Sequence, residues 1–174
     1  FILLTGYLAE KIEEYFKDGS VWGWLIQYSQ GPVEWDTGKR IWQAKGKLDE
    51  RFLLLYSDNF VPFPMDTVLA LHEKNRLALT FMVSAKSPGN IILDENGIVQ
   101  KYDYNRSTKL EYVEIGYMIV EKERTLKFFE TPECSFSSIL RKMAAQQQIS
   151  AWIQHDSYHS ISDPERWKKT EHYL

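Results

Sequence analysis

Short apolar runs of strand length alternate along the chain with segments whose apolar residues fall at helical spacing. This alternation is typical of α/β layered folds, in which helices cover a central sheet. With 174 residues, 44% of them hydrophobic, the chain is long enough to bury the core of one such domain over residues 1–174. The expected strands are Phe1–Leu4, Leu25–Ser29, Phe52–Tyr56, Ala78–Val83, Ile91–Leu93, Ile98–Tyr102, Tyr117–Val120 and Ile149–Ile153.

The segments between these strands predict helices. Apolar spacing indicates helices over residues 7–16, 41–44, 65–72 and 136–143. Pro164 suits the first turn of a last helix, because its missing N–H group is not needed there. We expect the buried side of this last helix to carry Trp167, Tyr173 and Leu174.

Two strand regions carry more specific signals. Phe52–Tyr56 is continuously apolar, which is typical of a strand covered on both faces in a parallel sheet, so we expect it at the centre. Asp94-Glu95-Asn96-Gly97 separates two other runs, and Asn-Gly favours the positive φ angles of tight turns. We therefore expect a local antiparallel hairpin around Asn96-Gly97.

Charge and cysteine content exclude several classes of partner. The net charge is −3, and Lys and Arg are interspersed with Asp and Glu, so we expect no nucleic-acid partner. No apolar run approaches the roughly 18 residues of a membrane-spanning helix, so we expect no membrane partner. The single cysteine, Cys134, cannot form an internal disulfide or a thiolate cluster and fits a reducing cytoplasm. The protein could also form a homo-oligomer.

Asp58 is the first candidate functional residue. It follows the apolar run Phe52–Tyr56 almost directly, and the end of a buried strand is where open α/β sheets bind ligands. A carboxylate there could hold Mg²⁺ against substrate phosphates. The alternative is that Asp58 caps the next turn or helix, and local sequence alone favours this alternative.

Two further segments offer weaker signals. The Thr37-Gly38 turn enters a helix and could present N–H groups to an anion beside Lys39 and Arg40, although an ordinary turn is the favoured interpretation. His155, Asp156 and His159 could form a metal site only on a helix, and strand-like and turn-like neighbours make that spacing uncertain, so we expect no metal there.

Five stretches, in order, resemble the sugar-1-phosphate nucleotidyltransferases, which join a nucleoside triphosphate to a sugar 1-phosphate and release pyrophosphate. The similarity covers nearly all of the chain. The stretches are residues 3–16, similar to a strand and its following helix, Thr37-Gly38 with residues 41–44, Tyr56-Ser57-Asp58-Asn59, Val113-Glu114-Ile115-Gly116-Tyr117, and Ser160-Ile161-Ser162-Asp163-Pro164-Glu165-Arg166.

The resemblance implies a fold and a set of site residues. The fold would be a mostly parallel, Rossmann-like sheet flanked by helices. Asp58 would be the catalytic metal-binding aspartate, with Mg²⁺ as cofactor and a nucleoside triphosphate and a sugar 1-phosphate as partners. Thr37 and Gly38 would lie near the base, and Gly89, Asp103 and Gly116 would lie near the sugar.

The chain also departs from the family's pattern. Ser160 stands at the position of a second metal-binding aspartate, and Asp103-Tyr104-Asn105 stands where Glu-Lys-Pro is common. A neutral hydroxyl cannot supply the charge of a carboxylate to Mg²⁺, so a catalytically inactive nucleotide-sugar-binding or regulatory homologue is the alternative function.

The family's opening strand and its Gly-rich phosphate loop find no match in this sequence. Because the chain starts at Phe1 inside an apolar run, we expect a sheet incomplete at its N-terminus, with roughly 50 residues upstream. The intact protein is then the expected enzyme, and the 174 residues alone are expected to be inactive.

Overall fold

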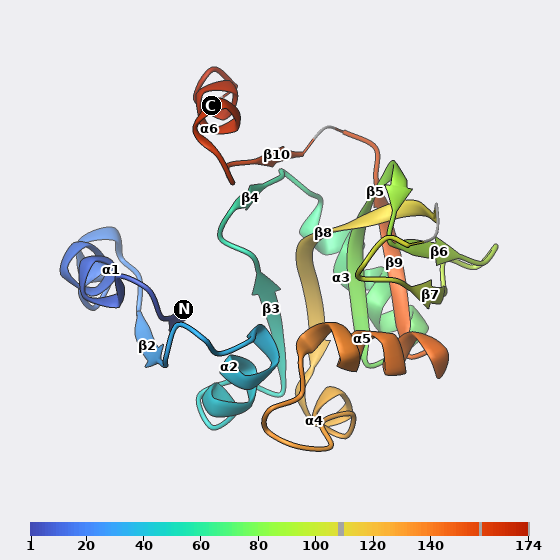
Figure 1. Cartoon of the computed structure of the whole chain (residues 1–174), viewed down its shortest axis with the longest axis horizontal. Helices are drawn as coiled ribbons and strands as arrows, with labels where there is room; N and C mark the ends of the chain where they lie inside the picture. The colour runs from blue at the N-terminus through green and yellow to red at the C-terminus, as the bar shows by residue number, and fades with distance from the viewer. Residues whose placement is uncertain (108–109, 157, 174) are drawn as a thin grey trace.

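The structure is a computed structural model that describes residues 1–107, 110–156 and 158–173. Its main sheet has six strands in the order β7-β6-β8-β5-β9, with β3 paired on β8 (Figure 1). None of the helices in these described ranges is long and apolar enough to cross a membrane. The strands of this sheet are β3 (Arg51–Leu55), β5 (Leu79–Gly89), β6 (Ile91–Leu93), β7 (Val99–Tyr102), β8 (Leu110–Glu121) and β9 (Ile149–Gln154).

Helices cover both faces of the main sheet. On one face, α2 (Thr37–Ala44) and α5 (Phe136–Ala145) share a core cluster with β5, β8 and β9. On the other face, α3 (Met65–Asn75) packs through Val68 against a second cluster. A short helix, α4 (Lys122–Leu126), follows β8 at the lower edge of the sheet in Figure 1.

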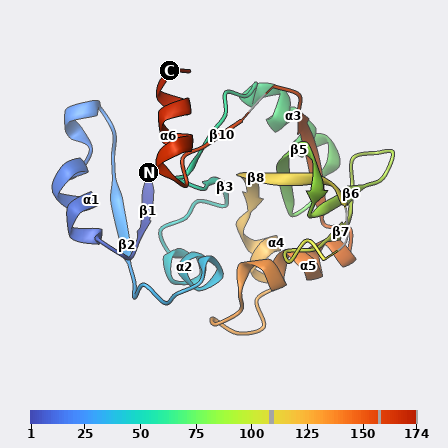
Figure 2. The same cartoon turned by 45° about the horizontal axis from the view of Figure 1, so that its top comes forward.

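Two smaller units complete the chain. In one, β1 (Ile2–Thr5) pairs in parallel with β2 (Gln27–Gln30), joined by α1 (Ala9–Phe16) and the 3₁₀ helix η1 (Ser20–Trp22). Both views show this unit beside the main sheet, next to α2 (Figure 2). In the other unit, β4 (Asn59–Phe60) pairs antiparallel with β10 (His159–Ser160), which leads into α6 (Pro164–Glu171).

The predicted α/β class is confirmed, and so is the predicted hairpin. β6 and β7 pair antiparallel around Gly97, whose φ of +75° is the positive angle that Asn-Gly turns need. The Asp94 carboxylate also accepts hydrogen bonds from the N–H groups of Asn96 and Ile98, at 2.9 and 2.8 Å.

The predicted central place of Phe52–Tyr56 is wrong. In the described part of the chain β3 pairs with β8 alone, and it pairs antiparallel. Nor is the sheet mostly parallel: β5 and β9 run in parallel, whereas β3, β5 and β6 all run antiparallel to β8. The reversed strand is β8: β3 and β5 both run against it, so these two strands and β9 point in the same direction.

The predicted buried side of the last helix is also wrong. Trp167 is 55% exposed and Tyr173 is 51% exposed, while the buried residue of α6 is Thr170. Trp167 stands among charged residues and has no apolar neighbour at helical spacing, so α6 has no stripe to bury. Leu174 lies outside the described residues.

Candidate functional site

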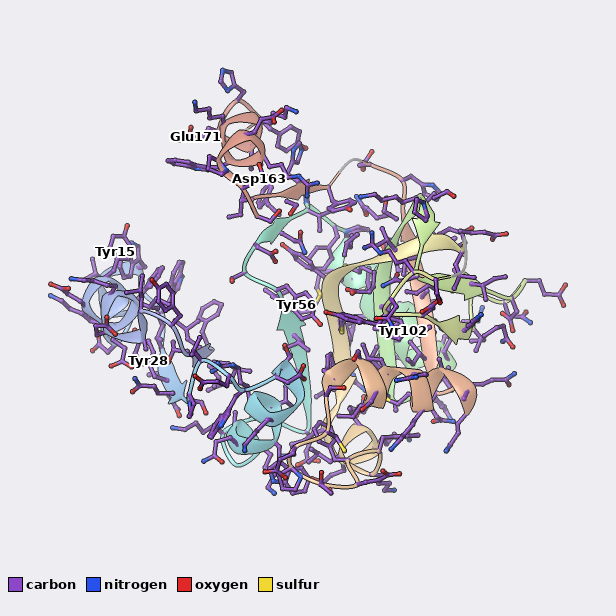
Figure 3. All side chains as sticks on the ribbon, in the orientation of Figure 1. Tyr15, Tyr28, Tyr56, Tyr102, Asp163 and Glu171 are labelled. Atoms are coloured by element: carbon purple, nitrogen blue, oxygen red, sulfur yellow. The ribbon has the colours of Figure 1, made fainter. Side chains whose placement is uncertain are left out.

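Four segments far apart in sequence meet at one end of β3 and the middle of β8. They are the start of α2, the turn after β3, the irregular part of β8 around Gly116, and the turn after β7. Tyr56 follows β3 and Tyr102 ends β7 (Figure 3). The pKa of each tyrosine is raised, first by burial and then by the charge of Glu114, and Asp36 adds to both shifts. Acidic groups from two segments, Glu114 in β8 and Asp36 before α2, therefore act on the same small region.

Asp58 lies exposed in the turn after β3, next to the strand pair β4–β10. Ser160 stands opposite Asn59 in that pair, and the Ile161 N–H group donates to the backbone oxygen of Asp58 at 2.7 Å. The structure thus places the Asp58 backbone beside position 160, which the sequence resemblance equates with a second metal-binding position.

The carboxylate of Asp58 accepts no hydrogen bond from any described residue, and the next helix, α3, begins only at Met65. The capping alternative therefore finds no support in the structure. Within the described ranges no three His, Cys, Asp or Glu side chains gather as a metal site. Asp58 offers a single exposed carboxylate.

Gly116 occupies a backbone position that few other residues can adopt. Its φ is +76°, and a Cβ added there would lie 2.8 Å from the side chain of Tyr56. The Tyr56 N–H group donates to the Gly116 oxygen at 2.8 Å. The register of β5 against β8 shifts in the same region. Because Gly116 has no Cβ, the Tyr56 side chain can pack closely against this irregular part of β8.

Gly89 and Asp103 shape the neighbouring part of the sheet. Gly89 is buried, and an added Cβ would lie 2.2 Å from the backbone oxygen of Tyr112, so glycine allows β5 to approach β8 closely. Asp103 follows β7, and one of its carboxylate oxygens accepts from the Ser107 hydroxyl at 2.6 Å. The Arg106 N–H group donates to the backbone oxygen of Asp103 at 3.0 Å, which closes the turn.

The start of α2 is held by Asp36. Its Oδ1 atom accepts from the Gly38 N–H group at 2.8 Å and from the Phe136 N–H group at 2.7 Å. Gly38 is buried, and a Cβ there would lie 2.3 Å from the backbone oxygen of Cys134. Thr37 is half-buried beside it. Gly38 therefore has a packing role at the start of α5.

The next two residues, Lys39 and Arg40, are cations whose side chains contact other parts of the protein. Lys39 pairs with Glu133 at 3.1 Å, and Arg40 donates to the backbone oxygens of Thr5, Pro32 and Trp35. The Gly38 N–H group is bonded to Asp36, so it is not free to bind an anion. The ordinary turn, favoured from sequence, is the interpretation that the structure supports.

Glu114 is the group that sequence reasoning missed as a functional candidate. It is half-buried in β8, and its Oε2 atom accepts from the Gly116 N–H group at 3.1 Å. Burial, with a smaller contribution from the charge of Asp58, raises the pKa of Glu114 to about 7, against the opposing effects of Gly116, Arg106 and Asn90. A carboxyl group whose pKa is shifted by burial and by a specific neighbouring charge is a functional-site candidate. The available signal was an acid between Val113 and Ile115 in an apolar strand.

Known proteins share both sequence and fold with this chain. No protein-family model matches it. A Bacillus subtilis (strain 168) protein assigned as a probable glucose-1-phosphate cytidylyltransferase is 28% identical over 130 residues, which are 62% of this chain and 51% of that protein. The match thus spans about half the length of this curated relative.

Solved structures extend the similarity of fold over the whole chain. HddC from Yersinia pseudotuberculosis has a TM-score of 0.76 at 14% identity, with 99% of this chain and 78% of HddC covered. The same protein complexed with GMP-PN gives a TM-score of 0.77 at the same identity and coverage. A Bacillus anthracis protein assigned as a glucose-1-phosphate thymidylyltransferase, in complex with sucrose, has a TM-score of 0.75 at 8% identity, with 95% of this chain and 71% of that protein covered.

Proposed function

Because the chain resembles the sugar-1-phosphate nucleotidyltransferases in sequence and in fold, we propose that the protein forms a nucleotide sugar and pyrophosphate from a nucleoside triphosphate and a sugar 1-phosphate. The observation that carries the proposal is the convergence of Asp58, position 160, the start of α2 and the Gly116 region of β8. These are the segments that the resemblance assigns to metal, base and sugar.

In this reaction an oxygen of the sugar phosphate attacks the α-phosphorus of the triphosphate. The bond from that phosphorus to the bridging oxygen breaks, and pyrophosphate leaves with the bond's electron pair. The protein's part is to bind both substrates in line and to stabilise the negative charge of the transferring group. Thr37 and Gly38 lie near the base in this proposal, and Gly89, Asp103 and Gly116 lie near the sugar.

Asp58 is the residue that would hold Mg²⁺. Its carboxylate is exposed and accepts no hydrogen bond from the described residues, so it is available as an oxygen ligand. Mg²⁺ is commonly held by only one or two carboxylates together with substrate phosphates, so this donor set fits the ion even with Ser160 as the neighbour. When bound, the ion neutralises charge on the phosphates.

A second candidate function is a nucleotide-sugar-binding or regulatory homologue without catalysis. The observation that favours it is the neutral Ser160 beside Asp58, together with the engagement of Lys39 and Arg40 in contacts within the protein. Both candidates bind nucleotides, but only the enzyme breaks the triphosphate.

Two measurements on the same protein decide between the candidates. Calorimetry with nucleoside triphosphates and nucleotide sugars, with and without Mg²⁺, tests binding, and a pyrophosphate-release assay with sugar 1-phosphates tests catalysis. With the intact protein we expect Mg²⁺-dependent binding of at least one nucleotide and release of pyrophosphate. Binding without release would favour the second candidate, and no binding of any nucleotide would contradict both.

A further inference from the structure

Tyr117 lies in β8, on the face of the sheet that α3 covers. It is only 8% exposed, and it belongs to the buried cluster that contains Val61 and Val68. Its ring meets that of Phe63 edge-on, with 5.5 Å between the ring centroids and 77° between the ring planes. This packing fixes the ring, and the direction of the ring fixes where its hydroxyl group lies.

The Tyr117 hydroxyl group donates to the backbone oxygen of Asn59 at 2.9 Å. Backbone carbonyl groups of successive residues in a strand point in opposite directions. The carbonyl group of Asp58 points to β10, where it accepts from the Ile161 N–H group, so that of Asn59 points away from β10. A buried tyrosine hydroxyl group needs a partner, and the Asn59 oxygen supplies it.

The turn that carries Asp58 is thus held at three points. The Tyr56 N–H group donates to the Gly116 oxygen at 2.8 Å, and the Asp58 oxygen accepts from the Ile161 N–H group at 2.7 Å. The third point is the Tyr117 bond, directly after Asp58. Gly116 and Tyr117 are consecutive in β8, which pairs with both β3 and β5, so two of the three bonds tie the turn to the main sheet.

The Asp58 side chain depends on these backbone contacts for its position. It is exposed, and none of the described residues donates a hydrogen bond to its carboxylate. Mg²⁺ demands nearly ideal ligand geometry. A ligand that is already in position before the ion arrives costs less ordering on binding than one on a freely moving turn.

We propose that Tyr117 is a positioning residue, whose hydroxyl group holds the turn after β3 so that the Asp58 carboxylate is in place when Mg²⁺ binds. The inference rests on the proposed function, because it takes Asp58 as the Mg²⁺ ligand. It adds a residue that acts on the ion through the backbone of the turn without touching the ion.

The test titrates Mg²⁺ into the intact protein with a nucleoside triphosphate and follows binding by calorimetry. ATP, CTP, GTP, UTP and dTTP are screened first, and the one that binds the original protein most tightly is used throughout. The variant is Tyr117→Phe, which keeps the ring and removes the hydroxyl group. The matched control is Tyr28→Phe, because the Tyr28 hydroxyl group also donates to a backbone oxygen, that of Lys17 at 2.6 Å, but in the unit of β1 and β2.

We expect Tyr117→Phe to raise the Mg²⁺ concentration that half-saturates nucleotide binding by about fivefold, the scale of fixing one backbone residue on binding. Tyr28→Phe should leave this concentration unchanged. Nucleotide affinity without Mg²⁺, measured in EDTA, should be the same in both variants as in the original protein.

A second comparison separates positioning of the ligand from a merely structural role. In the Asp58→Asn background the charged ligand is already lost, so Tyr117→Phe should cause no further shift in the half-saturating Mg²⁺ concentration. A merely structural role would lower the melting temperature and shift the Mg²⁺ concentration equally in both backgrounds.

Hydrogen exchange reports on the turn without any ligand. The Ile161 N–H group, which bonds to the Asp58 oxygen, should exchange faster in Tyr117→Phe than in the original protein or in Tyr28→Phe. Unchanged exchange would overturn the proposal. So would an unchanged Mg²⁺ concentration in Tyr117→Phe, or an equal shift in Tyr28→Phe or in the Asp58→Asn background.

Failure of the proposed function gives a different pattern. If exchange quickens as expected but the original protein binds no nucleotide in a Mg²⁺-dependent way, the proposed function is wrong, and the role of Tyr117 in Mg²⁺ binding fails with it. If the original protein does bind and Tyr117→Phe needs no more Mg²⁺, only the role of Tyr117 fails.

Discussion

Ser160 stands opposite Asn59 in the antiparallel pair of β4 with β10, so that position 160 lies one residue along the ladder from Asp58. The two segments are about a hundred positions apart in the chain, and this short pairing brings them together. Changes at Asp58 and Ser160 can therefore test the proposed metal position from both strands.

Replacing Asp58 with asparagine should weaken Mg²⁺-dependent nucleotide binding with little effect on folding. Asn keeps the size of the side chain but removes the charge, and no described residue donates to the Asp58 carboxylate. Turnover, if the protein is an enzyme, should fall by at least about tenfold, equivalent to roughly 1.4 kcal/mol. The measurements are calorimetric affinity and melting temperature. Asp94→Asn is the control, since it removes charge from hydrogen bonds within a hairpin and should lower stability without changing affinity.

Ser160→Asp should lower the Mg²⁺ concentration that half-saturates nucleotide binding. The change adds a second carboxylate beside Asp58, and more anionic ligands bind a divalent cation more tightly. A decrease of about tenfold is expected from one added charge contact. A magnesium titration monitored by calorimetry measures it. Ser162→Asp, two residues along, is the matched control, and an equal effect of both variants would point to a general charge effect.

Stability should fall as the pH drops below about 6.5 because of His72. His72 is buried, with Nδ1 2.7 Å from the Thr80 hydroxyl and Nε2 3.1 Å from Glu121. Burial lowers its pKa, against the opposing effect of Glu121. The unfolded chain, with the ordinary pKa of 6.5, then binds the proton first as the pH falls, so the stability present above this pH is lost below it. Thermal melting between about pH 5 and 8 checks this, and His72→Gln should flatten this part of the profile.

The ionisation of Glu114 should change the stability of the protein in the opposite direction, so that stability falls as the pH rises. Its pKa rises from 4.5 to about 7 on folding, so the folded protein holds the proton more tightly than the unfolded chain. Its contribution to stability is therefore present below pH 4.5 and is lost as the pH rises through about 7. Glu114→Gln should consequently melt at a higher temperature than the original protein at about pH 8, and this difference should shrink at about pH 5. A difference that does not depend on pH would contradict an origin in ionisation.

Gly116→Ala should destabilise the protein. The φ of +76° costs a residue with a Cβ about 1–2 kcal/mol, and that Cβ would lie 2.8 Å from the side chain of Tyr56. For a chain of this size each kcal/mol lowers the melting temperature by about 2–4 °C. Gly46→Ala is the control, because nothing lies within 4 Å of a Cβ at that position. Equal melting temperatures for the two variants would show that Tyr56 moves aside without cost.

The sequence predicted those features whose cause is local. The hairpin follows from Asp94 and Gly97, because the Asp94 side chain satisfies two nearby N–H groups and Gly97 supplies the positive φ. The start of the last helix at Pro164 also has a local cause, since the Asp163 carboxylate accepts from the Arg166 N–H group. The helix α2 begins at Thr37, four residues before the predicted start at Ile41, because the Asp36 side chain caps it there.

Features that depend on distant segments were not predictable in the same way. The continuous apolar run Phe52–Tyr56 indicates that these residues pack against other apolar groups. The run does not indicate whether those groups belong to a strand or to a helix. Among the strands that the structure describes, β3 has one neighbour, β8, and Leu55 at its end is 46% exposed. Glu114 was missed as a functional candidate for the same reason: an acid inside an apolar strand becomes meaningful only when Asp58 and Arg106 are known to lie nearby.

The Asp36 side chain links the first turns of the two helices α2 and α5. One oxygen atom, Oδ1, holds the N–H groups of both Gly38 and Phe136, although these residues are 98 positions apart. Neither helix can shift its first turn without lengthening a bond that the other helix also uses. A ligand that displaced the loop before α2 would therefore move the start of α5 with it, so the first turns of the two helices would shift together.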